Sequence, residues 1–315
     1  MSNKALTDQK KKEGFGAIIR RYWMFYLMIL PSLVLCVMFQ YINMPNHLIA
    51  FKKYNPYDGI FGSPWADQGG LANFIKFLTV PRLTVGIWNT FRVNFLNFVF
   101  GFPAPIILAL LFNELRNKAF RYGVQAISYL PAQLSGVVVI GLIHNFYATD
   151  GMLNDFRVWL FGPETERILF LAIQGLLIPN LIIIPLWQSV GMSSIMYTAM
   201  LAGIDQQMYE AAVVEGAGKI KQITKITLPH LAPYVTMGFI FGVSGWFTGG
   251  FGYLYQLTNA FVSLDTTDMI MLKQGLQAGD YSFTAAVGLL MTMINFVMLF
   301  GTNAIVKKLG GYAFI

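Results

Sequence analysis

Charged side chains are scarce in this sequence of 315 residues. Asp, Glu, Lys and Arg make up 12% of it and hydrophobic residues 56%, whereas charged residues are about a quarter of a soluble domain. Six stretches lack charge altogether, and each is long enough for the ~20 residues that cross the hydrocarbon core of a membrane. This pattern excludes a soluble domain and indicates an integral membrane protein. The stretches lie between Arg21 and Lys52, Arg92 and Glu114, Arg121 and Asp150, Arg167 and Asp205, Lys225 and Asp265, and Asp280 and Lys307.

Cysteine and the common catalytic motifs are also lacking. The single cysteine, Cys36, excludes an intramolecular disulfide and a cysteine metal cluster. The three histidines, His47, His144 and His230, are far apart, and neither a phosphate-binding loop nor a nucleophile elbow occurs. We therefore expect no catalytic residue, no metal site and no cofactor bound by this chain. If ATP drives its work, another chain must hydrolyse it.

The charge-free stretches are expected to be helices, because a chain in hydrocarbon must satisfy its backbone groups within each segment. We predict an all-α transmembrane domain over residues 23–306, between an N-terminal segment 1–22 and a C-terminal tail 307–315. Loops on the N-terminal side carry about twice as many basic residues as loops on the other side, which predicts that both chain ends are cytoplasmic. The six spans are expected near residues 23–42, 88–112, 123–147, 169–190, 234–257 and 282–305.

The net charge of +7 is interpreted as part of this topology signal. Because the basic residues are scattered over four loops, no nucleic-acid partner is expected. The basic run before the first span is also typical of a signal peptide. However, the apolar stretch of ~20 residues is longer than usual for one, and no small-residue cleavage pattern follows. We therefore expect a retained first span in a multi-pass protein of the cytoplasmic membrane.

The longest extracellular loop is expected over residues 43–86. It contains two segments rich in turn formers, 54–59 and 62–65, and the stretch 74–78 is consistent with a short interfacial helix. Its aromatic side chains are typical of a membrane-interface belt. Contact with an extracellular partner is the alternative.

Several polar or aromatic residues inside the spans are candidates for a solute pathway. Aromatic faces stack on the apolar faces of a sugar, and amide groups can pair with its hydroxyls. The alternative is that these groups hydrogen-bond between helices, and Arg92 can reach the membrane interface from the outer end of its span. Prolines in spans two, three and four indicate kinks, which either mark the pathway or help the bundle to curve. The pathway candidates are Arg92, Gln133, Asn145, Asn180, Trp187, Gln188 and Trp246.

A polar stretch, 210–229, interrupts the apolar sequence between spans four and five. It fits the pattern E-A-A, three residues, Gly, nine residues, I-x-L-P at every fixed position. This pattern is the signature loop of the membrane subunits of binding-protein-dependent ABC importers, the type I permeases. Segments 101–105, 113–114, 129–131 and 201–205 resemble the carbohydrate branch, in particular permeases for oligosaccharides and polysaccharide fragments. The matching positions are Glu210, Ala211, Ala212, Gly216, Ile226, Leu228 and Pro229.

The resemblance implies that loop 205–230 forms two short helices on the cytoplasmic face, of which the first docks in an ATPase subunit. Glu210 would pair with a basic residue of that subunit, beside the small surface of Ala211 and Ala212. Gly216 would allow a left-handed turn, and Pro229 and Pro233 would end the second helix before span five. The basic side chains of this second helix are expected to face lipid headgroups or water. These are Lys219, Lys221 and Lys225.

The resemblance also implies a function and a set of partners. The chain would be one permease of a pair, working with two ATPase subunits that use ATP and magnesium and with an extracellular solute-binding protein that delivers an oligosaccharide. A monosaccharide, a polyol phosphate or an acidic oligosaccharide is an alternative cargo. A secondary transporter that works without ATP is a further alternative, which the lack of acidic residues within the spans disfavours.

Overall fold

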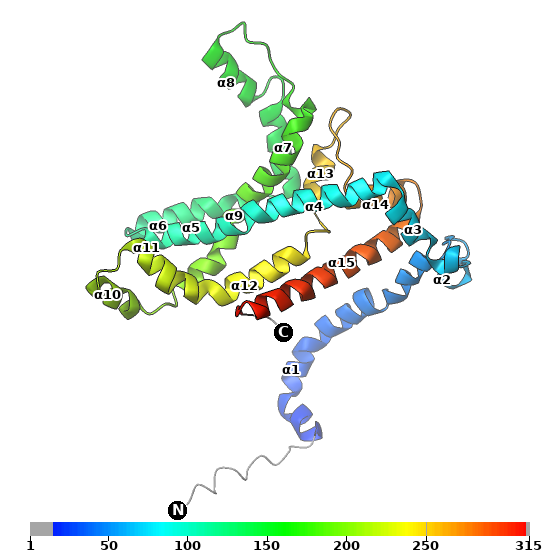
Figure 1. Cartoon of the computed structure of the whole chain (residues 1–315), viewed down its shortest axis with the longest axis horizontal. Helices are drawn as coiled ribbons and strands as arrows, with labels where there is room; N and C mark the ends of the chain where they lie inside the picture. The colour runs from blue at the N-terminus through cyan, green and yellow to red at the C-terminus, as the bar shows by residue number, and fades with distance from the viewer. Residues whose placement is uncertain (1–14, 250, 313–315) are drawn as a thin grey trace, which may run out of the picture.

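The computed structural model of the chain describes residues 15–249 and 251–312, so most of the expected N-terminal segment lies outside the described residues (Figure 1). Six helical segments in this part of the chain are long and apolar enough to cross a membrane. This confirms the predicted count of six spans in an all-helical membrane protein. The segments are Arg20–Phe51, Leu83–Glu114, Gly136–Phe161, Gln174–Leu201, Lys219–Ser244 and Tyr281–Lys308.

Between the gaps at 1–14, 250 and 313–315 the chain forms helices and no β-strand, only one isolated antiparallel bridge between Lys52 and Trp65. The longer α-helices are α1 Phe15–Cys36, α4 Pro81–Gly101, α5 Pro103–Glu114, α6 Lys118–Tyr129, α7 Gly136–Tyr147, α8 Met152–Phe161, α9 Leu177–Leu201, α10 Gln206–Val214, α12 Leu228–Ser244 and α15 Tyr281–Lys308. The shorter ones are α2 Gly59–Gly62, α3 Ala72–Thr79, α11 Lys219–Gln222, α13 Phe251–Leu257 and α14 Thr267–Met271.

The central bundle is built from two packed pairs of helices. Helices α4 and α5 run on from one another and pack along α9, and α12 packs along α15 (Figure 1). Buried apolar side chains form three clusters, around Leu181 near the start of α9, around Phe283 at the start of α15 and around Leu231 at the start of α12. These clusters fix the positions of α9 and α12. Loop 205–230, which we call the polar loop, joins the end of α9 to the start of α12.

Two spans are broken where the sequence offers no continuous helix. The expected third span, 123–147, changes direction between α6 and α7 through a 3₁₀ turn, Leu130–Gln133, because Pro131 lacks a backbone donor and Ser135 caps the new helix. The fifth ends at Ser244, and residues 245–249, which include Gly245 and Gly249, are not helical. The fourth span, expected near 169–190, begins instead at Leu177, because the segment before it forms short 3₁₀ turns.

Helix α1 stands away from the bundle (Figure 1). None of the most apolar window of the first span is buried against the rest of the chain. Its apolar side chains, such as Met28 and Phe39, are largely exposed. The core of the molecule is therefore built without α1.

The expected extracellular loop is an ordered unit. Its 3₁₀ segment Met44–Phe51 and helix α3 both pack against α15, and the backbone amide of Tyr54 donates to the Ser282 hydroxyl at 2.8 Å. The short helix expected at 74–78 is present as α3. However, Phe77 of that helix is fully buried against Phe283 rather than placed at a membrane interface.

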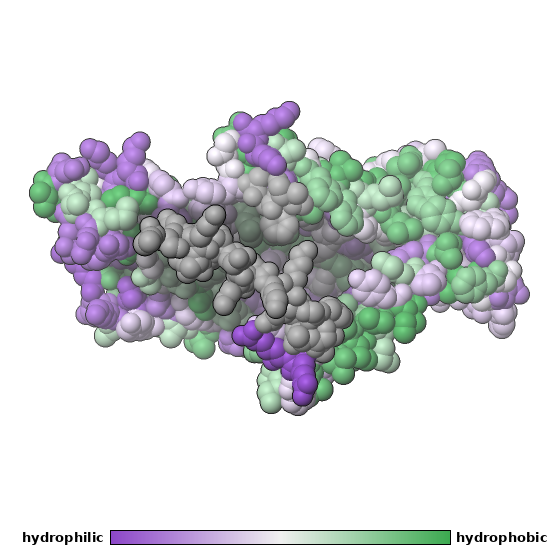
Figure 2. All heavy atoms as spheres, turned by 90° about the horizontal axis from the view of Figure 1, so that it is seen from below, coloured by the Kyte–Doolittle hydropathy of each residue, from purple (hydrophilic) through white to green (hydrophobic). Residues whose placement is uncertain are grey.

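Hydrophilic side chains gather toward the two ends of the long axis and in two patches near its middle, and hydrophobic ones cover much of the surface between them (Figure 2). One end is formed by α10 and α11, and the opposite end by α2 and α3 (Figure 1). Helices α4, α5, α12 and α15 run roughly along the long axis (Figure 1), with loop 205–230 toward one end and residues 44–80, here called the 44–80 unit, toward the other.

Candidate functional site

The polar loop begins with α10, which projects from the end of the bundle (Figure 1). Helix α9 ends at Leu201, and Asp205 starts the next helix by accepting a hydrogen bond from the backbone amide of Gln207 at 3.0 Å. An aspartate in this position satisfies one of the free amides at the start of a helix. The sequence therefore sets where α10 begins and lets it turn away from α9.

Gly216 ends α10 with the left-handed turn that the sequence predicted. Its φ is +73°, a conformation that side chains disfavour, and the amide of Ala217 donates back to the Ala212 carbonyl at 2.8 Å. The expected pair of short helices is thus joined by a turn that favours glycine.

The second short helix does not stop before span five, contrary to our expectation for Pro229 and Pro233. Helix α11 continues through a π-helical turn, Ile223–Thr227, into α12, so that Lys219–Ser244 is a single helical segment. In the π turn the amide of Leu228 bonds to the Ile223 carbonyl, and Pro229 follows in the first turn of α12, where a missing amide is tolerated.

The inner side of the loop is fastened to the bundle. The hydroxyls of Tyr209 and Thr227 share a hydrogen bond of 2.9 Å, and Gln222 donates to the Ala217 carbonyl at 2.8 Å. Ile226 and Tyr209 pack against the cluster around Leu231. Sequence reasoning assigned no function to Tyr209, Gln222 and Thr227, since their importance depends on contacts across the loop.

The outer side of α10 is left open. Glu210 and Ala211 are exposed, and Val213 and Val214 are 61% and 88% exposed. Apolar side chains at this exposure are typical of a surface that another protein covers. Of the other predicted residues, Ala212 is half-buried, Leu228 is 38% exposed, and Pro229 is exposed.

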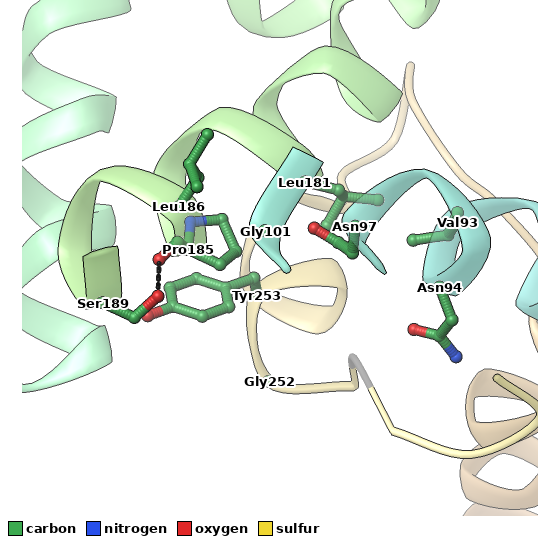
Figure 3. Close-up of a pocket in the computed structure, with 10 residues that line it drawn as sticks. All are labelled: Val93, Asn94, Asn97, Gly101, Leu181, Pro185, Leu186, Ser189, Gly252 and Tyr253. Carbon is green, nitrogen blue, oxygen red and sulfur yellow. Dashed lines mark hydrogen bonds between the residues drawn. The ribbon is translucent and has the colours of Figure 1, made fainter. Parts of the chain in front are cut away.

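A cavity of about 490 Å³ lies between α4, α9 and α13 (Figure 3). Asn97, Ser189 and Tyr253 bring polar groups to it, beside the apolar surfaces of Pro185 and Leu186. No charged residue belongs to its lining; the other lining residues are Val93, Asn94, Gly101, Leu181 and Gly252. Amide and hydroxyl groups next to apolar surface can bind a neutral polar solute such as a sugar.

Gln188, one of the predicted pathway residues, contacts a residue that lines this cavity. Its side-chain nitrogen donates to the Leu134 carbonyl at 2.7 Å, and its oxygen accepts a hydrogen bond from the Tyr253 hydroxyl. Gln188 therefore orients Tyr253, which lines the cavity. Asn180, also buried, accepts a hydrogen bond of 2.9 Å from Tyr147 and joins α9 to α7.

The other predicted pathway residues are not gathered in the cavity. Trp187 and Gln133 line a separate cavity of about 640 Å³ beside α5 and α6. Arg92 precedes Asn97 by five positions, about 140° around α4, and is exposed. Asn145 is exposed on α7. Trp246 packs between Phe95 and Phe98 in an aromatic cluster on α4.

Sequence reasoning also missed Asn94 and Asn97. Both are half-buried on α4, and Asn94 donates to the Trp246 and Thr248 carbonyls at 3.1 and 3.2 Å, across the break in span five. Asn97 points into the cavity (Figure 3). Their spacing of three along one predicted helix was a signal in the sequence that pointed to one helix face.

Comparison with known proteins supports the same reading. The family model described as "Binding-protein-dependent transport system inner membrane component" matches residues 101–311. Protein LplB of Bacillus subtilis (strain 168) is 33% identical over 306 residues, which cover 96% of this chain and 94% of that protein. The polygalacturonan/rhamnogalacturonan transport system permease protein YteP of the same organism is 34% identical over 304 residues, covering 96% and 93%.

Solved structures show the same fold. A bacterial ABC transporter involved in the import of the acidic polysaccharide alginate contains a chain that superposes with a TM-score of 0.82 at 29% identity, over 94% of this chain and 99% of that one. A second structure, with an alginate pentasaccharide-bound periplasmic protein, gives the same TM-score. The resemblance read from loop 205–230 is thereby confirmed. Since the family model matches more than half of the chain, and relatives above 30% identity span nearly all of it, this chain belongs to the family of binding-protein-dependent transport system inner membrane components, the permeases of type I ABC importers.

Proposed function

We propose that this chain is one permease of an ATP-driven importer that carries an oligosaccharide inward across the cytoplasmic membrane. An extracellular solute-binding protein delivers the oligosaccharide, a second and similar permease completes the pathway, and two ATPase subunits supply the energy. Both chain ends and loop 205–230 lie in the cytoplasm, and the 44–80 unit lies outside.

The observation that carries the ATP coupling is the two-sided construction of α10. Its inner side is tied to the bundle through Tyr209 and Thr227, while Glu210, Ala211 and Val214 are exposed, Glu210 and Val214 beside the cavity that Tyr209 also lines. Small residues allow another protein to come close, and a desolvated pair formed by Glu210 with a basic residue would orient it. A displacement of α10 by the ATPase would be transmitted directly to α9 and α12, because the loop joins these two helices.

The mechanism follows from these connections. Closure of the ATPase subunits on ATP would move α10, and with it the ends of spans four and five. Because Pro185 and Ser189 of α9 line the cavity, this movement would change the cavity shape and its access to the two sides of the membrane. ATP can shift the equilibrium between inward-open and outward-open states only as far as it binds one of them better.

The substrate class rests on the cavity and on the relatives. The amide, hydroxyl and apolar groups of the cavity match a sugar, and YteP and the alginate transporter are both named for the transport of polysaccharides. An acidic oligosaccharide is the second candidate, favoured by those two names. Basic residues that pair with its carboxylates would have to lie outside this cavity, because the lining contains neither Lys nor Arg.

The test is the charge reversal Glu210→Lys in cells that take up the oligosaccharide. We expect the variant to reach the membrane in normal amount, to lose uptake and to fail to co-purify with the ATPase subunit. Glu164→Lys, the same change in the loop before α9 at the far end of span four, is the control. Normal uptake by Glu210→Lys, with the ATPase retained, would overturn the docking role.

A further inference from the structure

An ion pair links the polar loop to a span with which it has no direct chain connection. Lys219 Nζ lies 3.0 Å from Glu114 Oε2. Lys219 is the first residue of α11, and Glu114 is the last residue of α5, the inner half of span two. No sequence pattern predicts this pair, and Lys219 was expected to face headgroups or water.

The position of the pair makes it more than a surface contact. Both residues lie at the edge of a cavity of about 620 Å³ between the ends of α5 and α6 and the loop, and Glu210 and Tyr209 line the same cavity. The pair thus closes the gap between the expected ATPase-facing helix and span two. Lys221 and Lys225, on the same helical segment, have no ion pair among those that the structure describes.

Span two connects this ion pair to the cavity between α4, α9 and α13, which we call the solute cavity. Helix α5 follows α4 with only Phe102 between them, and that residue keeps helical backbone angles. Three lining residues of the cavity, Asn94, Asn97 and Gly101, are on α4. The loop is covalently joined to α9 and α12 alone, so span two can follow it only through side-chain contacts.

We propose that Lys219 and Glu114 are positioning residues that make span two move with the polar loop when ATP binds. The pair transmits part of the ATP-driven movement to span two directly from the loop, in addition to the packing of α4 and α5 along α9. This inference rests on the proposed function. It adds a second connection between the ATPase and the solute site.

The exposure of the pair supports a role in movement rather than in folding. The side chains of Lys219 and Glu114 are 64% and 37% exposed, and ion pairs at such exposure contribute little to stability. Reversing one charge should therefore leave the bundle folded. It replaces attraction by repulsion only across the gap between α11 and α5.

The experiment measures movement of the two cavity walls separately in the complex of this chain with its ATPase subunits. In a Cys36→Ser background, Gly101→Cys reports on α4 and Leu186→Cys reports on α9, through their rates of reaction with a maleimide with and without ATP. Both positions line the cavity, and a Cβ at Gly101 meets no atom within 4 Å.

We expect ATP to change the labelling rate at both positions. Lys219→Glu and Glu114→Lys should each reduce the ATP-dependent change at Gly101→Cys at least about twofold and leave that at Leu186→Cys intact. The double reversal should restore it, since attraction returns with the charges exchanged. Lys221→Glu, the same substitution two residues away, is the matched control and should have no effect.

Three results would overturn the inference: unchanged labelling at Gly101→Cys in the single reversals, no rescue in the double reversal, or loss of the ATPase subunit from Lys219→Glu alone, which would place Lys219 on the ATPase rather than on α5. If the ATPase co-purifies but neither position responds to ATP even with the native pair, the proposed function fails as well. The two failures are therefore distinguishable.

Discussion

Gly191 of α9 lies against the backbone carbonyl of Ser128 of α6, so close that a Cβ at position 191 would overlap the carbonyl oxygen. This is where α6 crosses α9. Because backbone faces backbone there, neither helix can yield by moving a side chain. The crossing therefore requires glycine.

We expect Gly191→Ala to destabilise the folded protein by roughly 1–3 kcal/mol, because overpacking forces the two helices apart. The midpoint of thermal unfolding in detergent measures the effect. Gly141→Ala, on α7, is the control, since nothing lies within 4 Å of its added Cβ. It should be neutral or stabilising, because alanine favours a helix more than glycine does. Equal midpoints for the two variants would contradict the tight crossing.

The orientation of the chain can be tested with two exposed positions at opposite ends. Tyr57 is 96% exposed in the 44–80 unit, and Val214 is 88% exposed at the end of α10. In a Cys36→Ser background, an impermeant thiol reagent added to intact cells should label Tyr57→Cys and should label Val214→Cys only after the membrane is opened. Labelling in the reverse order would place the polar loop outside and exclude ATPase docking.

Asn97 should affect solute recognition. Replacing it with leucine removes an amide from the cavity and leaves a sugar hydroxyl without its partner, which costs about 1–3 kcal/mol. We expect Asn97→Leu to raise the KM for uptake with little change in the amount of assembled complex. Arg92→Gln is the control, because Arg92 lies on another face of α4. A larger effect at Arg92 than at Asn97 would instead favour an acidic substrate met by Arg92.

Asp268 should give the protein a pH-dependent stability. It lies between the fifth and sixth spans, and its Oδ2 accepts a hydrogen bond of 3.1 Å from the Gly249 amide. Burial raises the pKa of Asp268 above its ordinary value of 3.8, and the bond from Gly249 partly opposes this. The folded state thus holds the proton more tightly than the unfolded state. Its contribution to stability is complete below pH 3.8 and is lost as the pH rises through the raised pKa.

Asp268→Asn keeps an acceptor for Gly249 and removes the charge. Relative to the parent protein it should gain stability as the pH is raised from about 4 to about 7, as measured by thermal unfolding at each pH. Asp58→Asn, on the exposed outer loop, controls for the loss of a carboxylate. Parallel curves for the parent and Asp268→Asn would show that burial does not control this group.

The sequence was informative where a single local property decides the structure. Charge-free stretches revealed six spans, and Gly216 was correctly assigned a left-handed turn. The span boundaries were less certain, because the charge-free stretch from Ile168 to Ile204 is longer than one span and the helix occupies only its later part, from Leu177. Likewise, Pro229 and Pro233 were expected to stop a helix that the π turn before them allows to continue.

The solute cavity could not be derived, since it depends on which face each helix turns inward. Trp187 and Gln188 are adjacent in the sequence, but Trp187 lines the cavity beside α5 and α6, whereas Gln188 bonds to Tyr253 at the cavity beside α4. Composition alone does not show which of two adjacent residues faces a given cavity. The pair of Lys219 and Glu114 was equally hidden, because the two residues are far apart in the chain and meet only once α5 and α11 are placed.

The helical segment Lys219–Ser244, unbroken at Pro229, has a mechanical consequence. Its 26 residues form a helical rod about 39 Å long, with one end at the turn after Gly216 and the other at the bend before Trp246. When the rod is tilted slightly about its first end, its second end is displaced by a larger distance. That bend is held by Asn94, a residue of the solute cavity, so an angular displacement at one membrane face becomes a change of shape deep inside the bilayer.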